Sequence, residues 1–157
     1  MDLKYEHLLG REYEAGTVHC YSLVRDFYRD NFGILGADYA IPHDLDADVL
    51  NLVGLLHERE GMEKVENWTL KSLQPGDVLC TAIRAANPNH LVVYVGGNTV
   101  VHHLRGRTSC AEPLRDFWRM VTCFILRHPD VPDLRPTLSQ TTIMDLARAR
   151  YFPETAA

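Results

Sequence analysis

The sequence lacks the patterns that mark several specialised classes of protein. Its four cysteines are widely spaced and form no Cys-x-x-Cys pair, which argues against a zinc knuckle and against a disulfide framework. Lysine and arginine form no cluster and the formal net charge is −5 at pH 7, so nucleic acid is not expected as the main partner. The sequence has no internal repeat and no low-complexity tract, and we expect neither a cofactor nor a metal ion.

Long apolar runs are missing as well. The longest apolar-rich run, residues 49–56, is too short to cross a bilayer. Residues 1–7 lack the basic-then-apolar layout of a signal peptide. We therefore expect a chain that is made in a cytoplasm, does not insert into a membrane and is delivered elsewhere by another machine.

The composition that remains is that of an ordinary globular domain. With 157 residues, 46% of them hydrophobic and 24% charged, the chain can form one domain with a hydrophobic core. We assign this domain to residues 1–128, which contain the helix and strand patterns described below.

The end of the chain has a different composition. Pro129, Pro132 and Pro136 predict a stiff extended connector, and residues 140–151 predict a short helix. Residues 129–157 are too few to hold a core of their own. We interpret them as a Pro-rich connector and a C-terminal docking helix.

A cysteine opens an amphipathic helix near the N-terminus. Apolar residues recur at i, i+3, i+4, i+7 and i+8 from Cys20, which predicts one buried helical face. We expect this helix to run to about Asn31, with Gly33 as its C-terminal stop. The free N–H groups and the helix dipole at this end favour the thiolate of Cys20, which is the nucleophilic form. The alternative is that Cys20 is a small apolar residue of the core.

The other elements follow from periodicity and turn residues. A mostly buried second helix is predicted to begin at Asp46 or Asp48 and to end near Glu60. The turn Pro75-Gly76-Asp77 then opens the sheet. The remaining elements are predicted as strands over residues 78–83, 90–95, 99–104 and 120–127, and a short helix over residues 113–118.

The most specific pattern is a β-hairpin around Gly96-Gly97-Asn98. If these three residues form the loop, position 92 faces position 102, and His90 and His102 share one face of the sheet. His103 then points to the other face. A loop of even length would instead put His103 on the face of His90. Gly-Gly-Asn suits a three-residue loop with a residue at positive φ, and we therefore favour His102.

A thiol at a helix N-terminus and a histidine pair on a hairpin are the parts of a nucleophilic site. Cys20 would attack a carbonyl group, and its own backbone N–H would stabilise the oxyanion. His90 would take the thiol proton and later protonate the leaving amine, while His102 would orient the ring of His90. Two alternatives remain. In the first, the histidines are structural residues that are hydrogen-bonded within the sheet. In the second, Cys20, His90 and His102 form a metal site.

These short sequence motifs resemble those of the NlpC family of cysteine peptidases, which are papain-like hydrolases that cut the stem peptides of bacterial peptidoglycan. The resemblance covers roughly residues 8–126, and the helix after the cysteine is most similar to the branch found in phage tail assembly proteins. The histidines twelve positions apart on the hairpin are its most specific part. The matching residues are Tyr13, Cys20, Pro75-Gly76-Asp77, the segment His90-Leu91-Val92-Val93-Tyr94-Val95-Gly96, and His102.

The resemblance implies a fold and residue roles. It implies an α+β, papain-like fold in which an N-terminal nucleophile helix packs on an antiparallel sheet. It implies Cys20 as nucleophile, His90 as general base, His102 as the third member of a Cys-His-His triad, and Tyr13 near the oxyanion and substrate. Many family members have Asp-Cys-Ser where this chain has His19-Cys20-Tyr21. His19 and Tyr21 therefore line the substrate pocket without the fixed negative charge that would read a free amine.

The order of the residues separates the rival families. Lecithin-retinol-acyltransferase-type relatives place their histidines before the cysteine, which argues against lipid acyl transfer. Papain places its histidine much further from its cysteine, which argues against general protein digestion. Amidases of the CHAP type share the order and the chemistry and remain a near neighbour.

The resemblance predicts a cysteine endopeptidase that hydrolyses amide bonds in peptidoglycan stem peptides. The expected setting is a phage tail tip, in which the chain is part of the virion and acts in the host cell wall and periplasm. The expected partners are peptidoglycan and other tail-tip proteins. The alternative is a catalytically silent structural tail-tip protein that uses the same fold for assembly.

Overall fold

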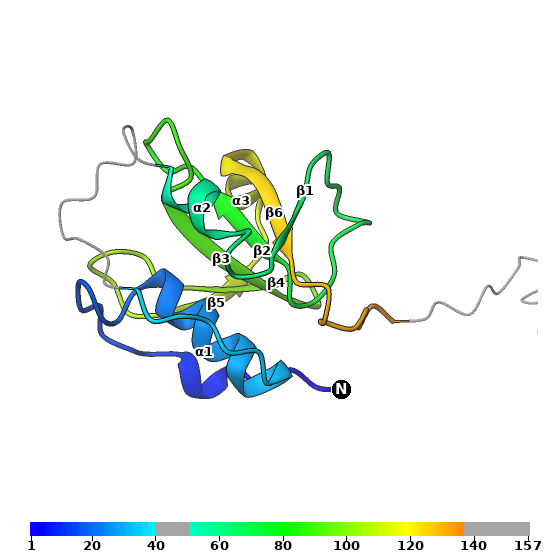
Figure 1. The fold of residues 1–157 in the computed structure, drawn as a ribbon, viewed down its shortest axis with the longest axis horizontal. Coiled ribbons are helices and arrows are strands. Elements are labelled where there is room, and N and C mark those ends of the chain that lie inside the picture. The colour runs from blue at the N-terminus through cyan, green and yellow to red at the C-terminus, as the bar shows by residue number, and fades with distance from the viewer. Residues whose placement is uncertain (40–50, 137–157) are drawn as a thin grey trace, which may run out of the picture.

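The computed structural model describes residues 1–39 and 51–136, which form a six-stranded antiparallel sheet with helices on both sides (Figure 1). The sheet has the strand order β1-β6-β2-β3-β4-β5. This arrangement confirms the predicted α+β class. In chain order the elements are the 3-10 turn η1 (Glu6–Leu8), α1 (Cys20–Phe32), α2 (Leu52–Leu56), β1 (Glu63–Val65), β2 (Val78–Thr81), β3 (His90–Gly96), β4 (Thr99–His102), β5 (Cys110–Pro113), α3 (Asp116–Val121) and β6 (Thr122–Arg127).

Helix α1 has the bounds that its sequence predicts. His19 and Ser22 form a reciprocal capping box at its N-terminus. At its other end Gly33 adopts a left-handed conformation with φ 68°, and its N–H donates to the carbonyl of Arg29 at 3.0 Å. The helix therefore begins at Cys20, the residue that its caps place at the edge of the sheet.

The two faces of the sheet carry separate cores. Figure 1 shows α1 on one side of the sheet and α3 on the other. The α1 side buries Leu23, Phe27 and Tyr28 against Val93 and Val101. On the α3 side the buried residues are Leu73, Leu79, Val92, Val100, Leu114, Trp118 and Ile125. Because alternate residues of a strand face opposite sides, His90 and His102 lie on the α3 side with Val92 and Val100.

The β3–β4 hairpin reaches the predicted register by a different route. Position 92 pairs with position 102, as predicted, but Gly96 pairs with Thr99, so the loop has two residues rather than three. A two-residue loop alone would have placed His103 opposite Val92. An irregularity between Tyr94 and Gly96 shifts the pairing by one residue and brings His102 back to that place.

Other predicted bounds need correction. The sheet does not begin at residue 78, because β1 pairs with β6 at one edge, and β5 forms the other edge without having been predicted. The short helix lies at Asp116–Val121 rather than at residues 113–118. The interior strands β2, β4 and β6 are each two residues shorter than predicted.

The second helix also differs from its prediction. Within the described residues it spans Leu52–Leu56, and the side chain of Asn51 caps it by accepting from the N–H of Gly54 at 2.8 Å. Leu55 is 67% exposed, so the helix is not mostly buried. The predicted caps Asp46 and Asp48 lie outside the described residues.

The connector after β6 stays close to the domain at first. Val131 is buried in the core on the α1 side, near Phe32 and Gly76. The predicted C-terminal helix over residues 140–151 lies outside the described residues. Within residues 1–39 and 51–136, none of the helices has the length and hydrophobicity needed to cross a membrane.

Candidate active site

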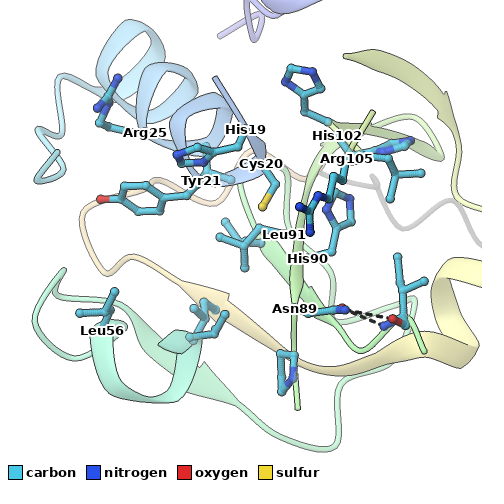
Figure 2. Close-up of a pocket in the computed structure, with 18 of the residues that line it drawn as sticks. His19, Cys20, Tyr21, Arg25, Leu56, Asn89, His90, Leu91, His102 and Arg105 are labelled. Carbon is cyan, nitrogen blue, oxygen red and sulfur yellow. Dashed lines mark hydrogen bonds between the residues drawn. The ribbon is translucent and has the colours of Figure 1, made fainter. Parts of the chain in front are cut away.

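One groove contains all three predicted catalytic side chains. Cys20, His90 and His102 line a cavity of about 1160 Å³ that opens between α1 and the sheet. Figure 2 shows the sulfur of Cys20 pointing from α1 toward β3, beside Leu91 and His90. The helix supplies the thiol and the sheet supplies the two imidazoles.

The backbone around His90 is held in place from both sides. In the preceding loop, the side chain of Asn89 donates to the carbonyl of Ile83 at 2.9 Å and accepts from its N–H at 2.9 Å (Figure 2). On β2, the hydroxyl of Thr81 donates to the carbonyl of His90 at 2.9 Å. These contacts fix the first residue of β3 at the mouth of the groove.

Burial controls the ionisation of Cys20. Burial raises the pKa of the Cys20 thiol, and the backbone N–H groups of Leu91, Tyr21 and Cys20 oppose this effect only in part. The expectation that the helix terminus favours the thiolate therefore does not hold for the free protein. The thiol is protonated at neutral pH and needs a base.

The two histidines form a buried pair on Trp118. The rings of His90 and His102 meet edge to face with their centroids 5.6 Å apart. The indole of Trp118 lies 5.9 Å from the ring of His90 and 4.6 Å from that of His102. Burial lowers the pKa of His90 to about 3, and it also lowers the pKa of His102. Both rings are therefore neutral at pH 7, so His90 can accept a proton.

Each ring has one buried nitrogen that lacks a hydrogen-bond partner, as does the ring of His103 at its Nδ1. In the pair, these atoms are Nε2 of His90 and Nδ1 of His102. The other nitrogen of His102, Nε2, lies 3.5 Å from a carboxylate oxygen of Glu112 and 3.4 Å from the sulfur of Cys110. Buried polar atoms are nearly always satisfied in folded proteins, so each exception calls for an explanation.

The comparison with known proteins identifies the family. Residues 10–127 match the NlpC/P60 family. The chain belongs to this family. It is 34% identical over 122 residues to tail tip assembly protein K of Escherichia phage lambda, and 28% identical over 133 residues to tail tip assembly protein K of Escherichia phage N15. These alignments cover 78% and 79% of this chain, but only 59% and 50% of the two relatives. The chain thus spans about half to three fifths of the length of the relatives that it matches.

The hairpin of this NlpC/P60 domain separates the two candidate histidines. His102 shares the α3 side with His90, whereas His103 lies against Tyr13, with the ring centroids 5.5 Å apart. A ring nitrogen of His103 lies 2.9 Å from the carbonyl of Arg107. The preference for His102 over His103 agrees with this geometry.

Three predicted substrate-pocket residues line the groove in different ways. The pKa of Tyr13 is raised by burial and by the nearby Cys20. His19 is buried, and its Nδ1 accepts from the N–H of Ser22, so it caps α1. The hydroxyl of Tyr21 donates to the carbonyl of Ala37 at 2.7 Å. The thiol of Cys20 thus influences Tyr13 electrostatically, while His19 and Tyr21 make structural hydrogen bonds.

The alternative metal site of Cys20, His90 and His102 is not formed among the described residues. Among the described residues, the one cluster of three histidine, cysteine or carboxylate donors within 4.8 Å of one another is His102, Cys110 and Glu112. It contains neither Cys20 nor His90. The thiol and the base of the predicted triad are therefore not arranged as ligands of a common ion.

Sequence reasoning missed Trp118 and Glu112, which complete the surroundings of the histidine pair. The indole Nε1–H of Trp118 donates to Oε1 of Glu112. Trp118 was assigned to a short helix with no role, and the segment around Glu112 showed no strand pattern. Only the fold of β5 and α3 beside β4 shows that these side chains meet.

Arginine outnumbers carboxylate along the groove. Within the described lining, the acidic residues are Glu60 and Glu112, and both accept hydrogen bonds, from Tyr39 and Trp118 respectively. The arginines of the lining are Arg25, Arg84, Arg105 and Arg107. The groove lining therefore carries more cationic than anionic side chains, of which Arg25 is paired with Asp38 and Asp26.

Proposed function

We propose that this NlpC/P60 domain is a cysteine endopeptidase that hydrolyses amide bonds in the stem peptides of peptidoglycan. The observation that carries the proposal is the groove that Cys20 lines together with two buried, neutral histidines. We assign this activity to residues 1–128. The connector and the predicted docking helix of residues 129–157 serve attachment rather than catalysis.

The chemistry begins with a neutral thiol and a neutral base. His90 takes the proton of Cys20 as the sulfur forms a bond to the amide carbonyl carbon. The carbonyl oxygen becomes an oxyanion, for which the backbone N–H of Cys20 at the start of α1 is a donor. When the C–N bond breaks, His90 returns its proton to the leaving amine and a thioester remains.

Water then completes the reaction. His90 takes a proton from a water molecule as the water oxygen attacks the thioester carbonyl. The C–S bond then breaks, the sulfur takes that proton back from His90, and the acyl group leaves as a carboxylic acid. His102 keeps the ring of His90 in the orientation that both steps require. Trp118 covers both rings and excludes solvent from them.

The charge of the groove supports a peptidoglycan substrate. Stem peptides carry free carboxylates, which the arginines of the groove complement. His19 and Tyr21 supply no negative charge in place of the aspartate found in many relatives. We infer that recognition relies on the carboxylates of the stem peptide rather than on a free amine.

Similarity to two tail tip assembly proteins supports a place in a phage tail. We propose that the chain is a component of the virion at the tail tip, contacts other tail proteins through residues 129–157 and acts on the host cell wall during entry. The expected partners are thus tail-tip proteins and peptidoglycan.

The proposal is tested by digesting purified Gram-negative peptidoglycan with the wild type and with Cys20→Ala, and identifying the products by mass spectrometry. New stem-peptide fragments should appear with the wild type and vanish with Cys20→Ala. Cys123→Ala, which removes an exposed cysteine outside the groove, should leave the fragments unchanged. Equal fragments from the wild type and Cys20→Ala would contradict the nucleophile assignment.

A structural tail-tip role is the second candidate. Burial keeps Cys20 protonated and His90 neutral, which is also the state expected of a site that performs no chemistry. A folded wild type that yields no fragments, yet binds other tail-tip proteins as tightly as Cys20→Ala does, would favour this candidate.

A further inference from the structure

Glu112 stands at the outer end of a line of polar side chains that leads to Cys20. Its Oε1 lies 3.5 Å from Nε2 of His102 and also accepts the indole N–H of Trp118. The ring of His102 in turn meets the ring of His90. The triad therefore has a carboxylate behind its third member.

A carboxylate in this position decides where a neutral imidazole carries its proton. An ionised carboxylate only accepts hydrogen bonds, so it favours a proton on the facing nitrogen, Nε2 of His102. Nδ1 of His102 is then left with its lone pair. The same relation sets the tautomer of histidines in carboxylate–histidine pairs elsewhere.

We propose that Glu112 is a positioning residue, which holds the proton of His102 on Nε2 and thereby the proton of His90 on Nε2, so that Nδ1 of His90 is free to act as the base. The inference rests on the proposed function, since it assigns a direction to the proton transfer from Cys20. Its physical content, however, is the tautomeric state of two rings, which is measurable without any substrate.

The two unpartnered nitrogens are the pair that this tautomer pattern requires. A bare Nδ1 of His102 is an acceptor, and a protonated Nε2 of His90 is a donor. Two imidazoles joined by a linear hydrogen bond of about 2.9 Å have ring centroids roughly 5 Å apart. The observed centroid separation of 5.6 Å is close to this value.

The surroundings of Glu112 fit a positioning role. Trp118 fixes the carboxylate through its indole N–H and covers both rings, which strengthens electrostatic effects between them. Glu112 also raises the pKa of His102 against the opposing effect of burial. The carboxylate is 37% exposed, so we expect a moderate effect of its charge rather than a dominant one.

Cys110 is the competing partner of His102. Its sulfur lies 3.4 Å from the same Nε2, and a thiol is a weak acceptor compared with a carboxylate. The three donors of His102, Cys110 and Glu112 are also close enough together to hold a metal ion such as Zn²⁺. The experiment must distinguish these two cases from the proposal.

The test compares the wild type with Glu112→Gln and Cys110→Ala, using two readouts. Long-range ¹H–¹⁵N correlation spectra show which nitrogen of each histidine ring carries the proton. We expect Nε2–H for both rings in the wild type and in Cys110→Ala, and a mixture of tautomers in Glu112→Gln. Steady-state hydrolysis should show a kcat about tenfold lower in Glu112→Gln, with KM unchanged. The acidic limb of its pH profile should move to lower pH.

The two readouts separate the failure of the inference from that of the proposed function. A wild type that cuts no peptidoglycan but shows both Nε2–H tautomers, with the mixture in Glu112→Gln, would leave the inference standing. Unchanged tautomers in Glu112→Gln would overturn it, as would a larger change in Cys110→Ala. A Co²⁺ thiolate absorption band that requires both Cys110 and Glu112 would also overturn it, because the three donors would then form a metal site. Absence of the band supports the proposal.

Discussion

Two buried polar clusters in the same sheet differ in how completely their hydrogen bonds are made. The carboxylate of Asp77 accepts from Nε and Nη2 of Arg127 at 2.8 Å each and from the backbone N–H of Gln74 at 2.8 Å. His90 and His102 each keep a buried nitrogen with no partner. The first cluster is saturated and the second is open.

The difference separates what holds the fold from what is available for chemistry. Removing one member of a saturated buried pair leaves the other charge uncompensated, so such a cluster contributes to stability in its present form. An open nitrogen costs free energy in the folded state and is tolerated where it has another use. The predictions below test this distinction, beginning with the largest effect.

Replacing His90 by leucine should separate activity from stability most clearly. Without its base, hydrolysis should fall by about 10⁴-fold, as in other peptidases that lose a triad member. The free energy of unfolding should change by no more than about 1 kcal/mol, because the buried Nε2 of His90 makes no hydrogen bond in the structure. Peptidoglycan digestion and urea denaturation measure the two effects.

The matched control for this prediction is His7→Leu. His7 is exposed and pairs with Asp30 at 2.8 Å, away from the groove. His7→Leu should change neither the rate of hydrolysis nor the free energy of unfolding by much. A His90→Leu protein that is less stable than the wild type by about 3 kcal/mol or more would show that His90 supports the fold as strongly as the saturated cluster does.

The interior of the fold was predictable from the sequence and its edges were not. Strands β2, β3 and β6 bury apolar residues on both sides, and their runs of valine, leucine and isoleucine signal this burial. β1 and β5 have few buried residues and form by pairing their backbones with a neighbouring strand. Such pairing leaves little pattern in the side chains, which is why both edge strands were missed.

The site was predictable where it depends on residues close in the sequence. The alternation of side chains along the hairpin predicted that His90 and His102 share one face of the sheet. They share it because of an irregularity near the loop, which the sequence did not signal. The contacts of Trp118 and Glu112 depend on how β5 and α3 pack beside β4. The raised pKa of the Cys20 thiol likewise results from tertiary burial, which outweighs the local effect of the helix terminus.

Removal of Asp77 should have the largest effect on stability. Asp77→Ala leaves Arg127 without its partner in a buried setting, and we expect a loss of about 3 kcal/mol in the free energy of unfolding. Hydrolysis per folded molecule should be unchanged. Urea denaturation measures the loss, and Asp30→Ala, which removes a more exposed ion pair, should cost about 0.5 kcal/mol. Equal losses in the two variants would contradict the role of burial.

The open cluster should make stability depend on pH. Burial lowers the pKa of His19, His90, His102 and His103. As the pH falls below 6.5, the unfolded chain binds protons that the folded chain does not, so the free energy of unfolding decreases. For His90 this loss continues down to pH about 3, its pKa in the folded state. Each fully buried histidine contributes a slope of at most about 1.4 kcal/mol per pH unit.

Urea denaturation between pH 7 and pH 5 measures this slope, because ordinary carboxyl groups titrate below this range. His90→Leu should reduce the slope by the share of one histidine, whereas His7→Leu should leave it unchanged. A wild type with constant stability over this range would mean that the histidines are accessible to protons in the folded state.

The smallest effect is expected at the capping box that precedes the thiol. The hydroxyl of Ser22 accepts from the N–H of His19 at 2.8 Å and donates to the carbonyl of His19 at 2.9 Å. Ser22→Ala removes both bonds and should cost about 1 kcal/mol, while Ser22→Thr should retain most of it. Faster amide hydrogen exchange in the first turn of α1 should accompany the loss. Because the capping box positions the N–H of Cys20 but not the histidine pair, kcat should fall while the histidine tautomers stay as in the wild type. A change of tautomer in Ser22→Ala would show that the capping box and the histidine pair are coupled rather than independent.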